Sequence, residues 1–324
     1  MKVTPAMQFP VDQLYNLEIE AKKKTEVVQT SRKNFFKSEL NRDEFTPTKK
    51  LAEQGALPGK TGPWEKVSLD FSRFSLTDEQ LCELAEFIES QPVLLRDLYL
   101  NLSECSGQES QLGLETMFKS LENAKGLQIL TINLSSSRYA ENDETLSILG
   151  KSVVDLPALK GFSLDISGNN FSDKSVAGLF YDLPKAKTLK EVSFDFSGSK
   201  QISIKTFEEI SNSVAQSESL KKISLDFSNI NKIDDESTVY FGWVLGGMAS
   251  EPEEFNLNIG GTQCTKSGIE NIAQSSKSSG IKKLNIYAMD APHINDDAHH
   301  IIKELRAYGM DATLYTRPKD FGFA

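Results

Sequence analysis

One short phrase of alternating apolar and polar residues recurs eight times along this chain, with 29 to 32 residues between corresponding positions. The alternation in Val67-Ser68-Leu69-Asp70-Phe71 has the period of a strand with one buried face. So regular a period indicates units that stack, because one unit alone cannot bury its apolar face. The copies are EKVSLDFS at 65–72, RDLYLNLS at 96–103, LQILTINLS at 127–135, LKGFSLDIS at 159–167, LKEVSFDFS at 189–197, LKKISLDFS at 220–228, EEFNLNIG at 253–260 and the weaker IKKLNIYAM at 281–289.

The residues between two phrases follow a helical pattern. In the stretch TDEQLCELAEFIES, we expect Thr77 to be the N-cap, with Gln80 at the third helical position. A strand, a turn, a helix and a return in about 31 residues make one β–α unit, and stacked units place parallel strands on one side and helices on the other. The apolar side chains of that helix share one face: Leu81, Leu84, Ala85 and Ile88.

The phrase L-x-x-L-x-L resembles the leucine-rich repeat, and the repeat length and helical second half resemble its ribonuclease-inhibitor-like class. The match covers roughly residues 65–316. The resemblance implies an α/β horseshoe solenoid with strands on the concave face and helices on the convex face. Serine stands near the place where the family has Asn, after one additional apolar residue. This longer form resembles divergent repeats of protists, ciliates especially.

The concave face of such a solenoid would carry the polar residues of each phrase. These are small, polar and mildly acidic, and they allow two interpretations. The face is either a docking strip for a basic peptide or helix, or a solvated ladder of hydrogen bonds between neighbouring strands. The candidate partner-binding residues on this face are Asp70, Tyr99, Asp165, Asp195, Asp226 and Tyr287.

Residues 1–64 share nothing with the repeat and form a separate arm, whereas residues 65–324 form a repeat domain of about eight units with a C-terminal cap and tail. We expect a helix within 11–40 and an extended linker over 41–64. The arm either lies along the solenoid as a partial N-terminal cap or acts as a tether to a partner. As a tether its anchors would be Phe9, Tyr15, Phe35, Phe36 and Phe45.

The C-terminal residues predict a closing element. After a helix in INDDAHHIIKELRAY, Ala312 and Leu314 are expected in a final edge strand. The tail beyond it carries Phe321 and Phe323, which either contact a neighbouring molecule or fold back on the last repeat.

No catalytic, cofactor or metal site is predicted. The stretch 55–61 resembles a phosphate loop but has three residues between its glycines instead of four, and no strand precedes it. The acidic and histidine side chains at 296–300 are better explained by a solvated helix than by a metal site. Three cysteines without C-x-x-C spacing indicate neither a disulfide framework nor a zinc site: Cys82, Cys105 and Cys264.

Charge is divided unevenly along the chain. Residues 1–60 hold 11 Lys or Arg against 8 Asp or Glu, a net of +3, whereas the remaining residues have a net of −13. An acidic body argues against a nucleic-acid partner, since phosphate binding needs clustered Lys and Arg. The start lacks a signal-peptide core and no run is long enough to span a bilayer, so we expect a cytoplasmic protein.

These observations favour a non-catalytic scaffold that binds other proteins, a structural subunit of a larger assembly tethered by its arm. A cytoskeletal or axonemal complex, in the cytoskeleton or a cilium, is the setting that the protist-like repeats suggest. The alternative is a regulatory leucine-rich-repeat protein, such as a small-GTPase activator or an enzyme inhibitor.

Overall fold

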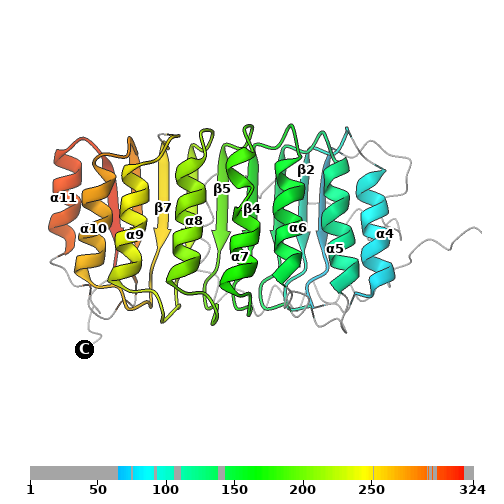
Figure 1. Ribbon diagram of the computed structural model, residues 1–324, viewed down its shortest axis with the longest axis horizontal. Helices are drawn as coiled ribbons and strands as arrows, with labels where there is room; N and C mark the ends of the chain where they lie inside the picture. The colour runs from blue at the N-terminus through cyan, green and yellow to red at the C-terminus, as the bar shows by residue number, and fades with distance from the viewer. Residues whose placement is uncertain are drawn as a thin grey trace, which may run out of the picture.

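The repeat builds a single parallel sheet in a computed structural model of the chain, and the α/β solenoid is confirmed (Figure 1). The structure describes residues 65–73, 76–90, 93–105, 111–137, 143–250, 252–289, 291, 294 and 298–316. Its strands neighbour one another in the order of the sequence, and the sheet does not close. They are β1 (Lys66–Asp70), β2 (Asp97–Asn101), β3 (Ile129–Asn133), β4 (Gly161–Asp165), β5 (Glu191–Asp195), β6 (Lys222–Asp226), β7 (Glu254–Asn258), β8 (Lys283–Tyr287) and β9 (Asp311–Tyr315).

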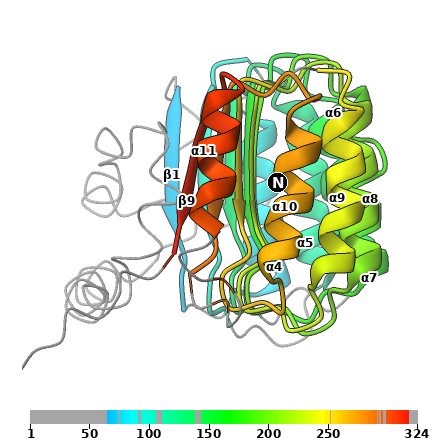
Figure 2. The ribbon, with the colours of Figure 1, turned by 90° about the vertical axis from the view of Figure 1, so that its left-hand side faces the viewer.

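The described helices cover one face of this sheet (Figure 2). Strands β1 and β9 stand out on the side away from the helices, so the open face of the sheet is the concave one. The helices are α4 (Asp78–Glu89), α5 (Gln111–Ser120), α6 (Asp143–Val154), α7 (Asp173–Phe180), α8 (Ile204–Gln216), α9 (Asp235–Gly246), α10 (Lys266–Ser276) and α11 (His299–Ala307), with short 3-10 turns at Leu121–Asn123 and Leu183–Lys185.

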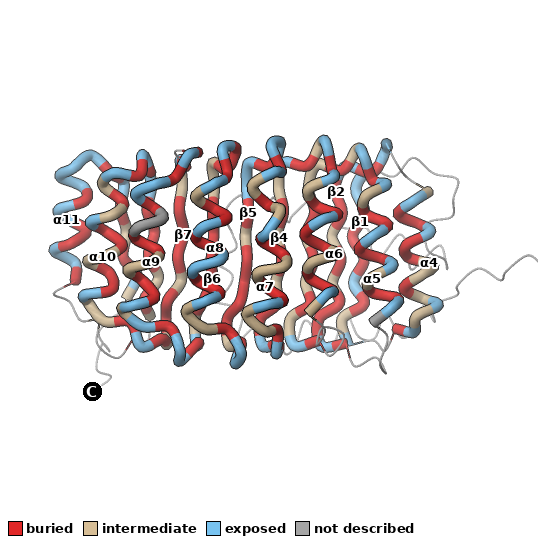
Figure 3. The backbone as a smooth tube through the Cα atoms, in the orientation of Figure 1, coloured by how far each residue is buried: buried red, intermediate tan, exposed pale blue. Residues whose placement is uncertain are grey.

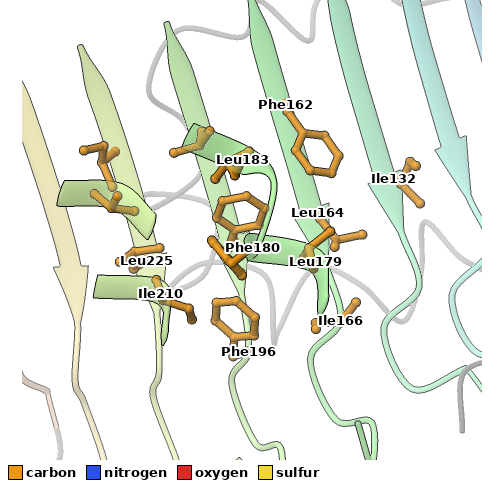
Figure 4. Close-up of a cluster of buried hydrophobic side chains, with 14 of the residues drawn as sticks. Ile132, Phe162, Leu164, Ile166, Leu179, Phe180, Leu183, Phe196, Ile210 and Leu225 are labelled. Atoms are coloured by element: carbon orange, nitrogen blue, oxygen red, sulfur yellow. The ribbon is translucent and has the colours of Figure 1, made fainter. Parts of the chain in front are cut away.

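The core lies between sheet and helices and runs through every repeat (Figure 3). The second and fourth residues of each strand point into it, as the period of two requires. Phenylalanines form its middle: Phe180 of α7 lies 4.7 Å from Phe194 of β5, and Phe196 stacks on Phe227 at 5.2 Å between ring centroids (Figure 4). Because each repeat shares this core with its neighbours, the stack is one continuous hydrophobic body.

Hydrogen bonds between successive helix starts join the repeats on the convex side. Asp173, the first residue of α7, accepts hydrogen bonds from the backbone N–H of Ser203 at 2.8 Å and from its hydroxyl at 2.6 Å. Asp235 of α9 is bonded in the same way to Thr265. These residues are the N-caps of the following helices, so one carboxylate satisfies groups of two helices.

The ends of the solenoid follow the sequence in part. The N-cap Thr77 and its capping box with Gln80 are present. The final strand exists as β9, with Ala312 and Leu314 buried. The arm 1–64 and the tail 317–324 lie outside the described residues, and so do the anchors named from sequence in both segments.

Candidate interaction face

Three columns of side chains face the open side of the sheet. They come from the first, third and fifth residue of each strand, because strand pairing keeps equivalent residues side by side. Adjacent rungs of a column are about 4.8 Å apart. The third column is Ser68, Tyr99, Thr131, Ser163, Ser193, Ser224, Asn256, Asn285 and Thr313, and the fifth is Asp70, Asn101, Asn133, Asp165, Asp195, Asp226, Asn258, Tyr287 and Tyr315.

The fifth column has a structural role in the turn that follows each strand. From β1 to β7, an Oδ1 atom of this Asp or Asn accepts the backbone N–H two residues further on, at 2.8 to 3.1 Å. The resemblance to leucine-rich repeats had suggested that the later serine replaces the turn-binding Asn. In this chain the turn is held by the Asp or Asn two residues before that serine, a local pattern in which these residue types are common.

A hydrogen-bond ladder crosses the C-terminal half of the face. The amide of Asn285 donates to Asn256 Oδ1 at 2.7 Å, and the amide of Asn256 donates to Ser224 Oγ at 3.0 Å. In the next column, Asn258 donates to Asp226 Oδ2 at 2.8 Å. The ladder considered from the sequence is therefore present over β6 to β8, where it fixes the polar side chains in place.

Three aspartates form an acidic centre on adjacent strands β4, β5 and β6. Asp165, Asp195 and Asp226 occupy successive rungs of the fifth column. Asp195 is 2% exposed and Asp226 is 3% exposed, although both lie on the open face. Burial raises the pKa of Asp195 well above its ordinary range, and the neighbouring carboxylates of Asp226 and Asp165 raise it further. An approaching cation would relieve this unfavourable environment of the ionised form.

A pair of tyrosines ends the same column. The rings of Tyr287 and Tyr315 are parallel to within 5°, with centroids 4.3 Å apart, and Tyr315 is 41% exposed. Burial, together with the adjacent Tyr315, raises the pKa of Tyr287 to about 12, so the hydroxyl stays protonated at neutral pH. The sequence analysis named Tyr287 but missed Tyr315, because the ninth strand carries only a faint copy of the repeated phrase.

The first column carries paired charges that the sequence analysis did not single out. Lys66 and Asp97 form an ion pair at 3.3 Å across β1 and β2. Similar pairs join β5 to β6 at 3.8 Å and β7 to β8 at 3.1 Å. The signal was available in the residue before each strand alternation, but only the register of the sheet shows that opposite charges lie side by side.

The six candidate residues of the sheet lie on one face but not in one cluster. Asp165, Asp195 and Asp226 are adjacent, whereas Asp70 is exposed on the edge strand β1. Tyr99 on β2 is half-buried and is separated from Tyr287 on β8 by five strands. The face therefore offers an acidic middle and aromatic rungs nearer its two ends.

Groups suited to metal binding or nucleophilic chemistry do not gather in the described part of the chain. No cluster of three or more His, Cys, Asp or Glu side chains with metal-binding geometry occurs there. His299 and His300 are exposed on α11, while Asp296 and Asp297 lie outside the described residues. Burial raises the pKa of the Cys264 thiol to about 12. None of the described helices combines the length and the apolar character that crossing a bilayer demands.

Comparisons with known proteins add little to this geometry. No protein-family model matches the chain, and no curated protein matches it. Among solved structures, the actin-binding site 2 of leiomodin-1 is similar at 19% identity and a TM-score of 0.35, over 45% of this chain and 78% of that one. A chain of the yeast Rad7–Elc1 complex shares 17% identity at a TM-score of 0.47, over 89% and 66%. The leucine-rich-repeat-containing protein LegL7 of Legionella pneumophila shares 13% identity at 0.46, over 78% and 73%.

Proposed function

We propose that this chain is a non-catalytic protein–protein interaction scaffold whose concave face binds a basic segment of a partner protein. The observation that carries the proposal is the acidic centre of Asp165, Asp195 and Asp226, with two of its carboxylates almost fully buried on an open face. A buried carboxylate flanked by like charges is unfavourable when ionised, and a Lys or Arg from a partner removes that cost through charge-assisted hydrogen bonds.

The tyrosine pair adds a second contact of compatible chemistry. Tyr287 and Tyr315 present a stacked aromatic surface on the column that also holds the acidic centre. Arginine side chains bind both carboxylates and aromatic faces, and tyrosine is one of the residue types that dominate interface energetics. The net charge of −13 outside the first 60 residues would also speed the approach of a basic partner.

The proposal includes the larger context suggested by the sequence. The repeats belong, on this view, to the ribonuclease-inhibitor-like class in its divergent protist form, and the chain is a structural subunit of a large cytoskeletal or axonemal assembly in the cytoplasm. Residues 1–64 are the arm that tethers the subunit, with Phe35 and Phe36 among its anchors, and residues 65–324 are the repeat domain. The tail residues Phe321 and Phe323 are further candidate contacts.

The test is affinity capture with the full chain, followed by mass spectrometry and by binding measurements on the recovered partner. The variant carries Asp165→Asn, Asp195→Asn and Asp226→Asn. Asparagine holds the same turn in β2, β3 and β7, so this variant loses three charges and keeps the fold. The matched control removes three exposed charges from the convex helices α8 and α9: Glu208→Gln, Glu209→Gln and Glu236→Gln.

We expect the aspartate variant to bind the partner at least tenfold more weakly and the convex control to bind it normally. Equal binding by both variants would exclude the concave face as the interaction surface. Loss of the partner on Phe35→Ala with Phe36→Ala alone would assign binding to the arm. Recovery of a small GTPase whose hydrolysis the chain stimulates would instead support the regulatory function.

A further inference from the structure

Two positions of each convex helix face the preceding repeat. The third residue after the N-cap does so in α7 and α8: the hydroxyls of Ser175 and Thr206 donate to aspartates that begin the helix before. The tenth residue after the N-cap does so in α8 and α10. Ser213 Oγ donates to the carbonyl of Phe180 in α7 at 2.8 Å, and Ser275 packs against Gly242 of α9, where an added Cβ would lie 2.6 Å from its hydroxyl.

In α4 the same tenth position holds a phenylalanine. Counted from the N-cap Thr77, the third residue is Gln80 and the tenth is Phe87. Helix α4 is the first described helix, so this side of it faces outward from the N-terminal end of the stack. An aromatic side chain thus takes the place where later repeats have serine, at the one helix with no described helix before it.

Phe87 is nevertheless only 5% exposed. The rest of the first repeat is equally well covered, with Val67 of β1 at 1% and Leu81 of α4 at 0%. At the other end of the solenoid, Leu305 and Leu314 of the last repeat reach the same burial. A terminal repeat exposes apolar core unless something caps it, so this degree of burial indicates a cap at the N-terminal end as well.

We infer that residues 1–64 of this chain form that cap by packing on the outward face of α4 around Phe87. The arm joins the solenoid at Glu65, immediately before β1, and even ten of its residues span up to about 35 Å, more than the width of one repeat. The charges are complementary, because the arm is basic by 11 Lys or Arg to 8 Asp or Glu. Helix α4 has five acidic side chains and no basic one: Asp78, Glu79, Glu83, Glu86 and Glu89.

This inference does not depend on the proposed function. It concerns the contact of the arm with its own solenoid, and it holds whether or not the concave face binds a partner. It also selects between the two roles considered for the arm from its sequence, because a segment that packs on α4 caps the solenoid and leaves only the remainder of the arm available as a tether.

The experiment is photo-cross-linking in the full chain with p-benzoylphenylalanine in place of Phe87. This residue keeps an aromatic side chain at the site. The matched control carries the same residue in place of Tyr181, which is 79% exposed at the end of α7. After irradiation, cross-linked peptides are identified by mass spectrometry, and monomeric and dimeric products are separated beforehand.

We expect position 87 to cross-link within the monomer to peptides of residues 1–64, at least fivefold more than position 181 does. Cross-links confined to residues 65–324 or to a second copy would overturn the inference, and so would an absence of cross-links. Hydrogen exchange on the unmodified full chain gives a second test. Part of 1–64 should be protected and should lose that protection in Phe87→Ser, whereas exchange of all of 1–64 at the rate of an unstructured peptide would also overturn it.

Discussion

At the C-terminal end of the solenoid, described residues close the stack, whereas at the N-terminal end the burial of the first repeat has no such explanation. Helix α11 packs on β9, and Lys277 of α10 pairs with Glu304 of α11 at 3.8 Å. The side chain of Arg306 donates to the carbonyl of Ala312 at 2.8 Å. In the other strands, the second residue directs its carbonyl to the following strand, so Arg306 takes the place of a missing tenth strand.

The comparison shows that interior repeats are interchangeable and terminal ones are not. Ser213 and Phe87 occupy the same helical position, but the serine contacts a preceding helix and the phenylalanine needs a different cover. The first helix and the last strand are therefore where this chain departs from its own repeat. We expect the largest changes in stability when these departures are removed.

The largest effect should follow the loss of a core side chain in the C-terminal closure. Leu305→Ala leaves a cavity under β9, since Leu305 is fully buried, and should cost about 3 kcal/mol. Because each repeat contacts only its neighbours, the loss of hydrogen-exchange protection should be confined to α10, β8, α11 and β9. Leu112→Ala, at an exposed position of α5, is the control. An equal loss of protection in β3 would show that the stack unfolds as one unit.

An interior link between repeats should have a smaller effect that depends on pH. Asp173→Asn removes the carboxylate that joins α7 to α8 and should cost about 1 kcal/mol at pH 7. Burial alone would raise the pKa of Asp173, but hydrogen bonds from Ser203 and Thr206 outweigh it and lower the pKa. The contribution is therefore complete above the unfolded pKa of about 4 and is lost as the pH falls through the lower folded value.

Urea denaturation of wild type and Asp173→Asn, at neutral pH and at about pH 3, measures this difference. The gap between the two proteins should narrow in acid. A gap that stays constant with pH would mean that the carboxylate charge does not contribute, and that shape alone joins the helices.

The smallest effect should come from Arg306. Replacing it with alanine removes one hydrogen bond at the edge of β9 and should cost about 0.5 kcal/mol. The exposed edge should also become available for pairing with another chain, which light scattering would detect as self-association. Arg306→Lys keeps the charge but not the fixed donor geometry, so it separates an effect of charge from one of edge protection. A monomeric alanine variant would show that α11 alone protects the edge.

The sequence predicted the sheet, its register and the face of each strand, because these follow from a period of two inside a period of about 31. Neighbouring residues such as Asp195 and Asp226 were placed in one column correctly for this reason. It did not predict the stacked partner Tyr315, whose strand lacks the repeated phrase. The exceptional position of Phe87 was also missed, since in the sequence it looks like an ordinary apolar residue of an amphipathic helix.

The side chains that hold the strand-end turns also set how this protein can change over evolutionary time. Asp and Asn both supply the oxygen that accepts the N–H two residues on, and seven strands carry one or the other. A single-nucleotide exchange between their codons alters the charge of the concave face by one unit and leaves the turn in place. Lineages of this chain can thus acquire or discard a charged recognition surface in small steps, each with little cost to folding.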